Sequence, residues 1–391
     1  MQSVELFAGA GGLAIGMANV GFRHAAVVEW DQYACETFRE NQIHHTLAVE
    51  GWPVHQIDAR TFDFSSIASE IAVVSGGPPC QPFSMGGKHQ AQDDARNMFP
   101  EAVRAVRELM PKAFIFENVK GLTRESFSSY FSYIHLQLQY PEIVRRADED
   151  WPHHRMRLEK HHTSNKSAPT YNVIFDVLNA ADFGVPQKRE RVFFVGFRSD
   201  LGVEWAFPKT THSATSLLRS KWVDGDYWDL HKIGKRSRPI ISAQQELMFE
   251  RLSASDADPR HRWNTTRDAL LGLPDPELRP SNKFINHVFT PGARSYVGHT
   301  GSLLDEPAKT LKAGQHGVPG GENMFIKDDG SVRYFTIREA ARLQTFPDEY
   351  EFHGSWSQAM RQLGNAVPVK LAEVVAGSVA ASLRSVADCN S

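Results

Sequence analysis

The sequence predicts an α/β protein whose main domain is a doubly wound, parallel sheet. In the first third of the chain, short apolar runs alternate with segments of helical periodicity, as expected of such a sheet. The runs end in residues that suit binding or chemistry, namely Phe7, Glu29, Asp58, Cys80 and Glu117. Because open α/β sheets bind ligands at the carboxyl ends of their strands, we expect these five residues to share one crevice.

Length and composition are those of an ordinary globular protein. The 391 residues are 41% hydrophobic and 23% charged, with a net charge of -3. We expect no membrane span, because no apolar run approaches about 18 residues, and no signal peptide, because strand-like sequence begins at Val4. The three cysteines lack paired spacing, which predicts neither a disulfide framework nor a metal site. A reducing, cytoplasmic compartment is therefore expected.

Positive charge gathers in the middle of the chain. Residues 151–240 contain 15 Lys and Arg against nine Asp and Glu, whereas residues 1–150 contain 12 against 19. A basic section in a slightly acidic protein suits contact with nucleic acid, and a solvated basic surface is the alternative.

Residues 1–199 carry the strand and helix alternation and are predicted to form the main domain. Residues 123–170 interrupt it as an inserted loop or helix pair. The four histidines within 151–162 come as adjacent pairs and lack the spacing of metal ligands, so no metal is expected. Residues 172–181 resume helical periodicity, and 191–197 are predicted as a strand.

The rest of the chain has a different character. Residues 200–332 are rich in Gly, Pro, Ser and Thr, which predicts a smaller, loop-rich and mostly β domain. Residues 333–391 return to helix, and Thr336 with Glu339 three residues later forms the pattern of a capping box.

A glycine-rich turn after the first apolar run is typical of cofactor binding. Gly9, Gly11 and Ala14 match the dinucleotide fingerprint, and Glu29 stands where a ribose-binding acid belongs. Alone, this pattern favours a nicotinamide enzyme. The same geometry suits any adenosine cofactor, because glycine lets a ligand approach the backbone and a carboxylate accepts both ribose hydroxyls. Trp30 offers a stacking face for adenine.

Cys80 is the candidate nucleophile. It follows a buried apolar run, and the glycines and two prolines of 76–79 give it a rigid backbone. A lone cysteine is most often a small buried hydrophobe, but such rigidity suits a sulfur held at a fixed distance from a substrate atom. The polar segment 84–97 suits a mobile lid.

Two further motifs bring charge to strand ends. Glu117 leaves an apolar strand next to Asn118 and supplies a candidate acid. Arg189 and Arg191, if both lie in a strand, point to the same face, where they could meet phosphate or a base carbonyl. A strand-end cap and an edge strand protected by charge are the structural alternatives.

In this order, the motifs resemble those of the DNA (cytosine-5)-methyltransferases, which methylate carbon 5 of cytosine with S-adenosylmethionine. The resemblance covers most of 3–122 and 172–199, then 335–378, which adds the motifs 338–344 and 362–368. It implies a Rossmann-like, S-adenosylmethionine-dependent large domain, a smaller target-recognition domain, a cleft for double-stranded DNA, and final helices that return to the large domain. The compact layout resembles bacterial or phage restriction-modification enzymes.

The resemblance also implies a role for each matched residue. Cys80 would be the nucleophile, Glu117 and Arg191 would hold the target cytosine, and Arg189 would lie near the DNA backbone. The implied S-adenosylmethionine site comprises Phe7, Ala8, Gly9, Gly11, Gly12, Leu13, Glu29, Trp30, Asp58, Ala59, Pro78, Asn365 and Ala366. The implied DNA contacts are Gln81, Ser84, Arg96, Arg294, Thr310, Lys312, Gln315 and His316.

The implied chemistry fits these residue types. Carbon 5 of cytosine is a poor nucleophile, so addition of the Cys80 thiolate at carbon 6 makes an enamine-like intermediate that attacks the sulfonium methyl. A protonated Glu117 would donate to N3, and Arg191 would bind O2. A base then removes the carbon 5 proton, the cysteine leaves, and S-adenosylhomocysteine is the other product. The target cytosine must first be flipped out of the duplex.

Three alternatives remain at this point. A transfer RNA cytosine-5 methyltransferase would use the same catalytic set, but the Cys-Phe-Thr tripeptide that we associate with that branch is absent from the sequence. An inactive DNA-binding homologue is disfavoured by intact Cys80, Glu117 and Arg191. A dinucleotide oxidoreductase leaves 78–81 and 187–191 unexplained. We also expect a monomer without membrane contact, and any cognate restriction endonuclease would act separately.

Overall fold

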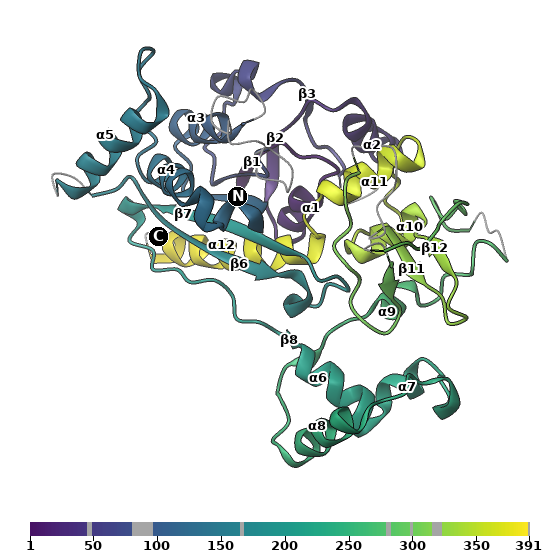
Figure 1. Ribbon diagram of the computed structural model, residues 1–391. Coiled ribbons are helices and arrows are strands. Elements are labelled where there is room, and N and C mark those ends of the chain that lie inside the picture. Colours follow the sequence, from purple (N-terminus) through teal and green to yellow (C-terminus); the bar gives the residue numbers. More distant parts are fainter. Residues whose placement is uncertain are drawn as a thin grey trace. The chain divides into compact units, whose positions relative to one another are not determined.

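The structure is a computed structural model that describes residues 1–44, 49–79, 97–164, 168–278, 283–297, 300–314 and 323–389 (Figure 1). The chain forms two compact units. The first unit comprises Met1–Leu178, Glu190–Pro208 and Ala372–Ser391, and the second unit comprises Asn179–Arg189 and Lys209–Leu371.

A seven-stranded sheet in the order β3-β2-β1-β4-β5-β7-β6 forms the centre of the first unit. Its strands are β1 Gln2–Leu6, β2 Arg23–Glu29, β3 Val54–Gln56, β4 Val73–Gly76, β5 Ala113–Val119, β6 Tyr171–Asn179 and β7 Glu190–Arg198. Strands β1 to β5 pair in parallel, and β7 runs antiparallel to β5. The strand order reverses between β1 and β4, which confirms the predicted doubly wound α/β fold.

The helices of the first unit cover this sheet (Figure 1). They are α1 Gly12–Asn19, α2 Gln32–Ile43, α3 Phe99–Leu109, α4 Ser128–Gln139, α5 Trp151–Thr163 and most of α12 Val369–Cys389. In α3 the buried residues recur at helical spacing, and the helix ends at Met110, which has a left-handed backbone and precedes Pro111. Strand β4 is buried throughout, and β5 as far as Asn118, as parallel strands covered on both faces require.

The helix predicted for residues 172–181 is wrong. Most of these residues form β6 and the adjoining turn. The segment is rich in β-branched and aromatic residues, which favour strands. Strand β6 lies at the edge of the sheet, and Ile174 and Phe175 are 38% and 46% exposed. Apolar residues on both faces of an edge strand produce a spacing that also fits a helix.

Residues 123–170 contain the helix pair α4 and α5, and its histidines have structural partners. His154 is buried and its Nδ1 lies 2.9 Å from the Tyr133 hydroxyl, while His162 Nδ1 lies 2.9 Å from the Tyr140 hydroxyl. Within the described ranges, no group of three His, Cys, Asp or Glu side chains could hold a metal ion. These two histidines therefore join the helices to each other.

The second unit combines short strands with short helices. Its strands are β8 His212–Ser213, β9 His261–Arg262, β10 Ser302–Leu303, β11 Met324–Ile326 and β12 Val332–Tyr334. Its helices are α6 Ala214–Arg219, α7 Asp226–Leu230, α8 Ala243–Ala254, α9 Thr266–Leu270, α10 Ile337–Leu343 and α11 Trp356–Asn365. Residues 200–332 thus carry more helix than the mostly β content we expected. Their Ser and Thr residues include the N-caps Ser213, Ser242 and Thr265, so a loop-like composition here begins helices.

Of the C-terminal segment 333–391, residues up to Leu371 belong to the second unit and Ala372–Ser391 belong to the first unit. The resemblance implies that the final helices return to the large domain. The capping box of Thr336 and Glu339 is present as predicted. Arg338 is fully buried and its guanidinium donates to the carbonyls of Ile285, Pro347 and Tyr350. These bonds tie α10 to its own unit.

One stretch, Trp356–Ala387, is long and apolar enough to cross a membrane, although we expected no run of that kind. It spans α11 and α12, and 61% of its most apolar window is buried inside the protein. A buried core helix passes the same test of length and composition, so this stretch is weak evidence for a membrane span.

Glu5 is an acid buried in the centre of the sheet. It is 1% exposed, lies opposite Ser75 in the pairing of β1 with β4, and accepts a hydrogen bond from the Ser75 hydroxyl. Burial raises the pKa of Glu5 from 4.5 to about 8, while the bond from Ser75 acts in the opposite direction. The folded protein therefore keeps a proton that the unfolded chain releases.

We predict that raising the pH from 5 to 8 destabilises the protein through Glu5. The stabilisation from its raised pKa is complete below pH 4.5 and is lost as the pH rises through about 8. A Glu5→Gln variant stays neutral, so its melting temperature should fall roughly 5 °C less than that of the wild type across this window. Thermal unfolding at both pH values measures the difference, and equal losses would contradict the prediction.

Candidate active site

The glycine-rich turn after β1 has an unusual backbone. Phe7, Gly9 and Gly11 have φ angles of 54°, 53° and 85°, in the left-handed region. For Phe7 this conformation is strained, and such strain concentrates at ligand sites. A Cβ atom at Gly9 would meet nothing within 4 Å, so the space beside its backbone is open. The turn can therefore admit a ligand close to the main chain.

Glu29, at the end of β2, joins this turn to the next strand. One carboxyl oxygen accepts from the Gly9 amide at 2.7 Å, and the other from the Trp30 and Asp31 amides at 2.9 Å and 2.8 Å. Burial raises the pKa of Glu29, and these hydrogen bonds oppose the shift. A carboxylate has about four acceptor positions, so three amides leave capacity for a ligand hydroxyl.

The ends of β2 and β3 bring two more predicted residues to this region. The Ile57 amide donates to the Glu29 carbonyl at 2.9 Å, and Asp58 follows directly. Arg60 pairs with Asp58 at 2.5 Å and lowers the pKa of that carboxyl. Trp30 is 71% exposed, which is unusual for so large an apolar side chain. The ends of β2 and β3 thus lead to an exposed aromatic ring and to a carboxylate that pairs with Arg60.

Three neighbouring strands end at the same level of the sheet. Leu6 of β1 lies opposite Gly76 of β4, which lies opposite Phe116 of β5. The next residues along the three strands are Phe7, Gly77 and Glu117. The strand register therefore brings the glycine turn, the chain that leads toward Cys80 and the candidate acid to one edge, as the sequence predicted.

Glu117 and Arg191 form a buried ion pair on one face of the sheet. Their Oε1 and Nε atoms are 2.8 Å apart, with 8% and 12% of the two side chains exposed. Arg191 lies opposite Val119 in the antiparallel pairing, which places it diagonally across from Glu117. Burial lowers the pKa of Arg191, and Glu117 opposes that shift. The pairing fits the prediction that both residues serve one site.

The backbone before Cys80 packs against this pair. A Cβ atom at Gly77 would lie 3.1 Å from Glu117 Oε2, and the Asn118 side chain donates to the Pro78 carbonyl at 2.8 Å. The Met98 amide donates to the Pro79 carbonyl at 3.0 Å. Cys80, Gln81, Ser84 and Arg96, with most of the predicted lid, lie outside the described residues.

Arg189 differs from the expectation that it lies near the DNA backbone. It precedes β7, so the alternation of a strand does not extend to it. In the second unit its side chain is fully buried, and its guanidinium donates to the carbonyls of Leu311 at 3.3 Å and Gly364 at 2.9 Å. The structure therefore assigns Arg189 to internal support of the second unit.

Gln187 is a supporting residue that the sequence analysis missed. It is fully buried, donates to the Leu343 carbonyl at 3.3 Å and accepts from the Leu311 amide at 3.1 Å. The Thr310 hydroxyl donates to the Lys188 carbonyl at 2.7 Å. Gln187 lies in the sequence two residues before Arg189, and a polar residue at that position gave no sign of burial.

The family model of the C-5 cytosine-specific DNA methylases matches residues 1–381. The chain belongs to this family. This match supports a DNA cytosine-5 methyltransferase and disfavours an oxidoreductase, a transfer RNA methyltransferase and an inactive homologue. Membership implies DNA as the substrate and S-adenosylmethionine as the methyl donor.

Two curated relatives illustrate the match. The Type II methyltransferase M.PspPI of Psychrobacter sp. (strain TA137) is 31% identical over 382 residues, which cover 96% of this chain and 78% of the relative. The Type II methyltransferase M.NgoMIV of Neisseria gonorrhoeae is 28% identical, with 98% of each chain covered.

Solved structures show the same fold at lower identity. An Escherichia coli prophage protein assigned as a DNA modification methyltransferase has a TM-score of 0.61 and 21% identity, covering 98% of this chain and 99% of its own. The S. pombe Dnmt2 methyltransferase has a TM-score of 0.55 and 18% identity, covering 98% of both. These similarities confirm the predicted methyltransferase fold.

The remaining predicted residues of this methylase are placed as follows. Ala8, Gly12, Leu13, Ala59 and Pro78 are buried in the first unit, as is Ala366 in the second unit. Asn365 ends α11 and is exposed, as are Arg294 and Lys312. Asn323 accepts from the Lys312 amide and donates to its carbonyl, both at 2.9 Å. Gln315 and His316 lie outside the described residues.

We predict that Gly77→Ala lowers the rate of DNA methylation roughly tenfold, because the new methyl group displaces the Glu117 carboxyl by a few tenths of an ångström. Gly377→Ala is the control, since its Cβ would make an ordinary contact 3.5 Å from Val20 Cγ1. Initial rates with tritiated S-adenosylmethionine measure both variants. A Gly77→Ala enzyme as fast as the control would contradict the claim that a methyl group at residue 77 displaces the Glu117 carboxyl and slows the reaction.

Proposed function

We propose that the protein methylates carbon 5 of a cytosine within a short specific sequence of double-stranded DNA, with Cys80 as covalent nucleophile. The convergence of three strand ends carries this proposal. It brings the glycine turn, the backbone that leads to Cys80 and the Glu117–Arg191 pair to one edge of the sheet. A methyl donor, a thiol and a base-binding pair are what the reaction requires.

The residues of the glycine turn fit S-adenosylmethionine. The open space at Gly9 suits close approach to the backbone, the remaining acceptor capacity of Glu29 suits a ribose hydroxyl, and the exposed Trp30 suits an adenine ring. When bound, the cofactor supplies a methyl group attached to a positively charged sulfur.

The catalytic residues would act on a cytosine flipped out of the duplex. The Cys80 thiolate forms a bond to carbon 6, and the electron pair of the 5,6 double bond moves toward carbon 5 and the ring. Glu117, protonated from solvent before the addition, donates a hydrogen bond to N3, while Arg191 remains charged beside O2. After methylation, a base removes the carbon 5 proton and the bond from sulfur to carbon 6 breaks.

The second unit would supply target recognition. Its segment at Thr310 and Lys312 is fixed by Gln187, Lys188 and Asn323, which gives side chains on that segment a rigid base for DNA contacts. The Type II names of the relatives support a restriction-modification role. We propose a cytoplasmic monomer, because one chain carries all the parts, and a cognate endonuclease that acts separately.

Cys80→Ala should abolish methylation. Without the sulfur no addition at carbon 6 can occur, so the rate should fall at least about a thousandfold. The measurement is methylation-sensitive sequencing of DNA from a methylation-deficient host that expresses either protein. We expect 5-methylcytosine at one short motif with the wild type and none with the variant.

Cys35→Ala is the matched control. Cys35 is fully buried in α2, and burial raises the pKa of its thiol to about 12, so it is no nucleophile. This variant should methylate the same motif. Persistent methylation in Cys80→Ala would refute the covalent role of Cys80, and no 5-methylcytosine with soluble wild type would refute the proposed reaction.

Trp30→Ala should weaken S-adenosylmethionine binding about tenfold, because an adenine stacking face is lost. Trp30 is 71% exposed, so the melting temperature should hardly change. Isothermal titration without DNA measures the affinity, and Trp30→Phe, which keeps an aromatic face, should bind nearly as well as the wild type. An unchanged affinity in Trp30→Ala would exclude stacking at this residue.

A further inference from the structure

Residues 214–254 of the second unit form a small helical lobe with its own apolar centre. Helices α6, α7 and α8 surround Leu217, Tyr227 and Trp228, and Trp222 stacks on Phe249 with ring centroids 5.4 Å apart (Figure 1). The Tyr227 hydroxyl donates to Asp305 at 2.8 Å, and Lys221 pairs with Glu306 at 3.0 Å. The lobe is therefore attached firmly to the rest of its unit.

A basic run follows α7 on this lobe. Residues 231–240 contain Lys232, Lys235, Arg236 and Arg238 and no acidic residue. Lys232, Lys235 and Arg236 are exposed, and within the described part of the chain their side chains have neither an ion-pair nor a hydrogen-bond partner. Residues 232–236 thus carry three cations without a partner among the described residues, although the protein as a whole has a net charge of -3.

The backbone of the basic run is held in place at both ends. His231 Nε2 lies 3.0 Å from Asp268 Oδ1, and Lys232 has a left-handed φ of 55°. The Ile233 amide donates to the Trp228 carbonyl at 2.8 Å. At the far end, Arg238 donates to the Ile233 carbonyl at 3.3 Å and lies over the Trp228 ring. The free cations are therefore carried by a fixed loop.

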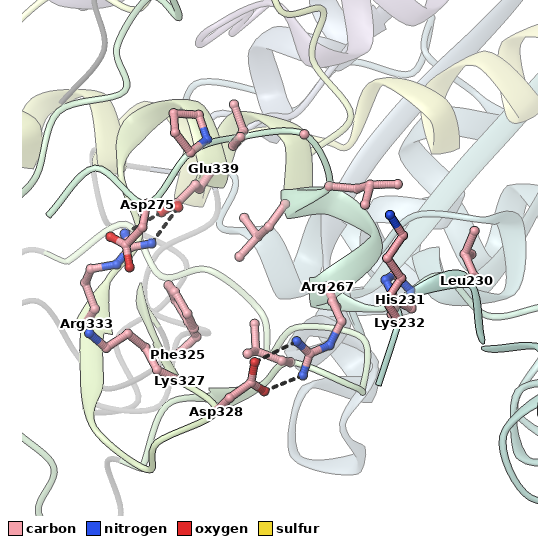
Figure 2. A pocket seen from close by; sticks show the side chains of 16 residues that line it. Leu230, His231, Lys232, Arg267, Asp275, Phe325, Lys327, Asp328, Arg333 and Glu339 are labelled. Carbon is pink, nitrogen blue, oxygen red and sulfur yellow. Dashed lines mark hydrogen bonds and ion pairs between the residues drawn. The ribbon is translucent and has the colours of Figure 1, made fainter. Parts of the chain in front are cut away.

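In a neighbouring pocket, two arginines form ion pairs with acidic residues of the protein. The pocket has a volume of about 480 Å³, and Lys232 is one of the residues that line it (Figure 2). Inside it, Arg267 pairs with Asp305 and Asp328 at 2.7 Å and 2.6 Å, and Arg333 pairs with Glu339 at 2.7 Å. Arg267 and Arg333 are therefore neutralised within the protein, and Arg238 of the basic run lies 3.7 Å from Asp229. Lys232, Lys235 and Arg236 have no such partner among the described residues and are available to another molecule.

We infer that the basic run Lys232–Arg238 binds the phosphates of duplex DNA without reading base sequence. The inference rests on the proposed function and adds a surface to it. DNA carries about one negative charge per 1.7 Å, which matches closely spaced cations that have no internal partner. Lys and Arg contacts to phosphate hold a protein on the duplex but carry no sequence information. The lobe would thus supply affinity, and other parts of the unit would supply specificity.

The test variant is Lys232→Gln/Lys235→Gln/Arg236→Gln in the full-length protein. The slope of log K against log salt is negative, and each lost phosphate contact reduces its magnitude by about 0.9, so we expect the slope to become less steep by about 2 to 3. DNA binding is measured by fluorescence anisotropy over a salt series, on a duplex with the methylated motif and on one without it. Both affinities should fall together, with their ratio unchanged.

The control is Arg145→Gln/Arg146→Gln/Lys160→Gln, which removes the same charge from three exposed residues of the first unit. It should keep the wild-type slope. A test variant with the wild-type slope, in a protein that still methylates DNA, would overturn the phosphate contact alone and favour an acidic protein partner for the lobe. A loss confined to the motif duplex would also overturn it. Wild-type protein that binds neither duplex would overturn the proposed function as well.

Discussion

The close contact between β1 and β4 is the constraint on which the candidate site depends. A Cβ atom at Gly76 would lie 2.4 Å from the Leu6 carbonyl oxygen, a distance that no side chain can accommodate. Only glycine lets the two strands end in register, and the glycine turn and the chain toward Cys80 then begin side by side. The chemistry proposed for this edge therefore depends first on a backbone contact.

The ion pair of Glu117 and Arg191 adds a second requirement at the same edge. Two charges removed from water cost several kcal/mol each, and their attraction repays this only with good geometry. A packing role alone would be served as well by apolar side chains. The base contact that we propose for Glu117 and Arg191 gives a reason to keep both charges, because the polar edge of the base would replace the hydrogen bonds that the two residues give up.

Much of the fold and part of the site could be predicted from sequence, for identifiable reasons. The strand ends were recognisable because apolar runs stop abruptly at Glu29 and Glu117, and parallel strands align their carboxyl ends. Strand β6 was mistaken for a helix because an edge strand with apolar residues on both faces has no clear period of two. The burial of Arg189 and Gln187 could not be predicted, for another reason. Their partners are backbone carbonyls and amides more than 100 residues away, which no local pattern reveals.

Helix α12 has a consequence for synthesis on the ribosome. Its buried face, which includes Val375, Ala376 and Val379, belongs to the first unit, and Arg384 donates to the Val20 carbonyl at 2.7 Å. All of Lys209–Leu371 is translated before this helix emerges, which takes roughly ten to thirty seconds. During that interval the sheet exposes the apolar surface that α12 later covers. A nascent chain arrested within the second unit therefore carries an incomplete first unit, a natural target for chaperones and proteases.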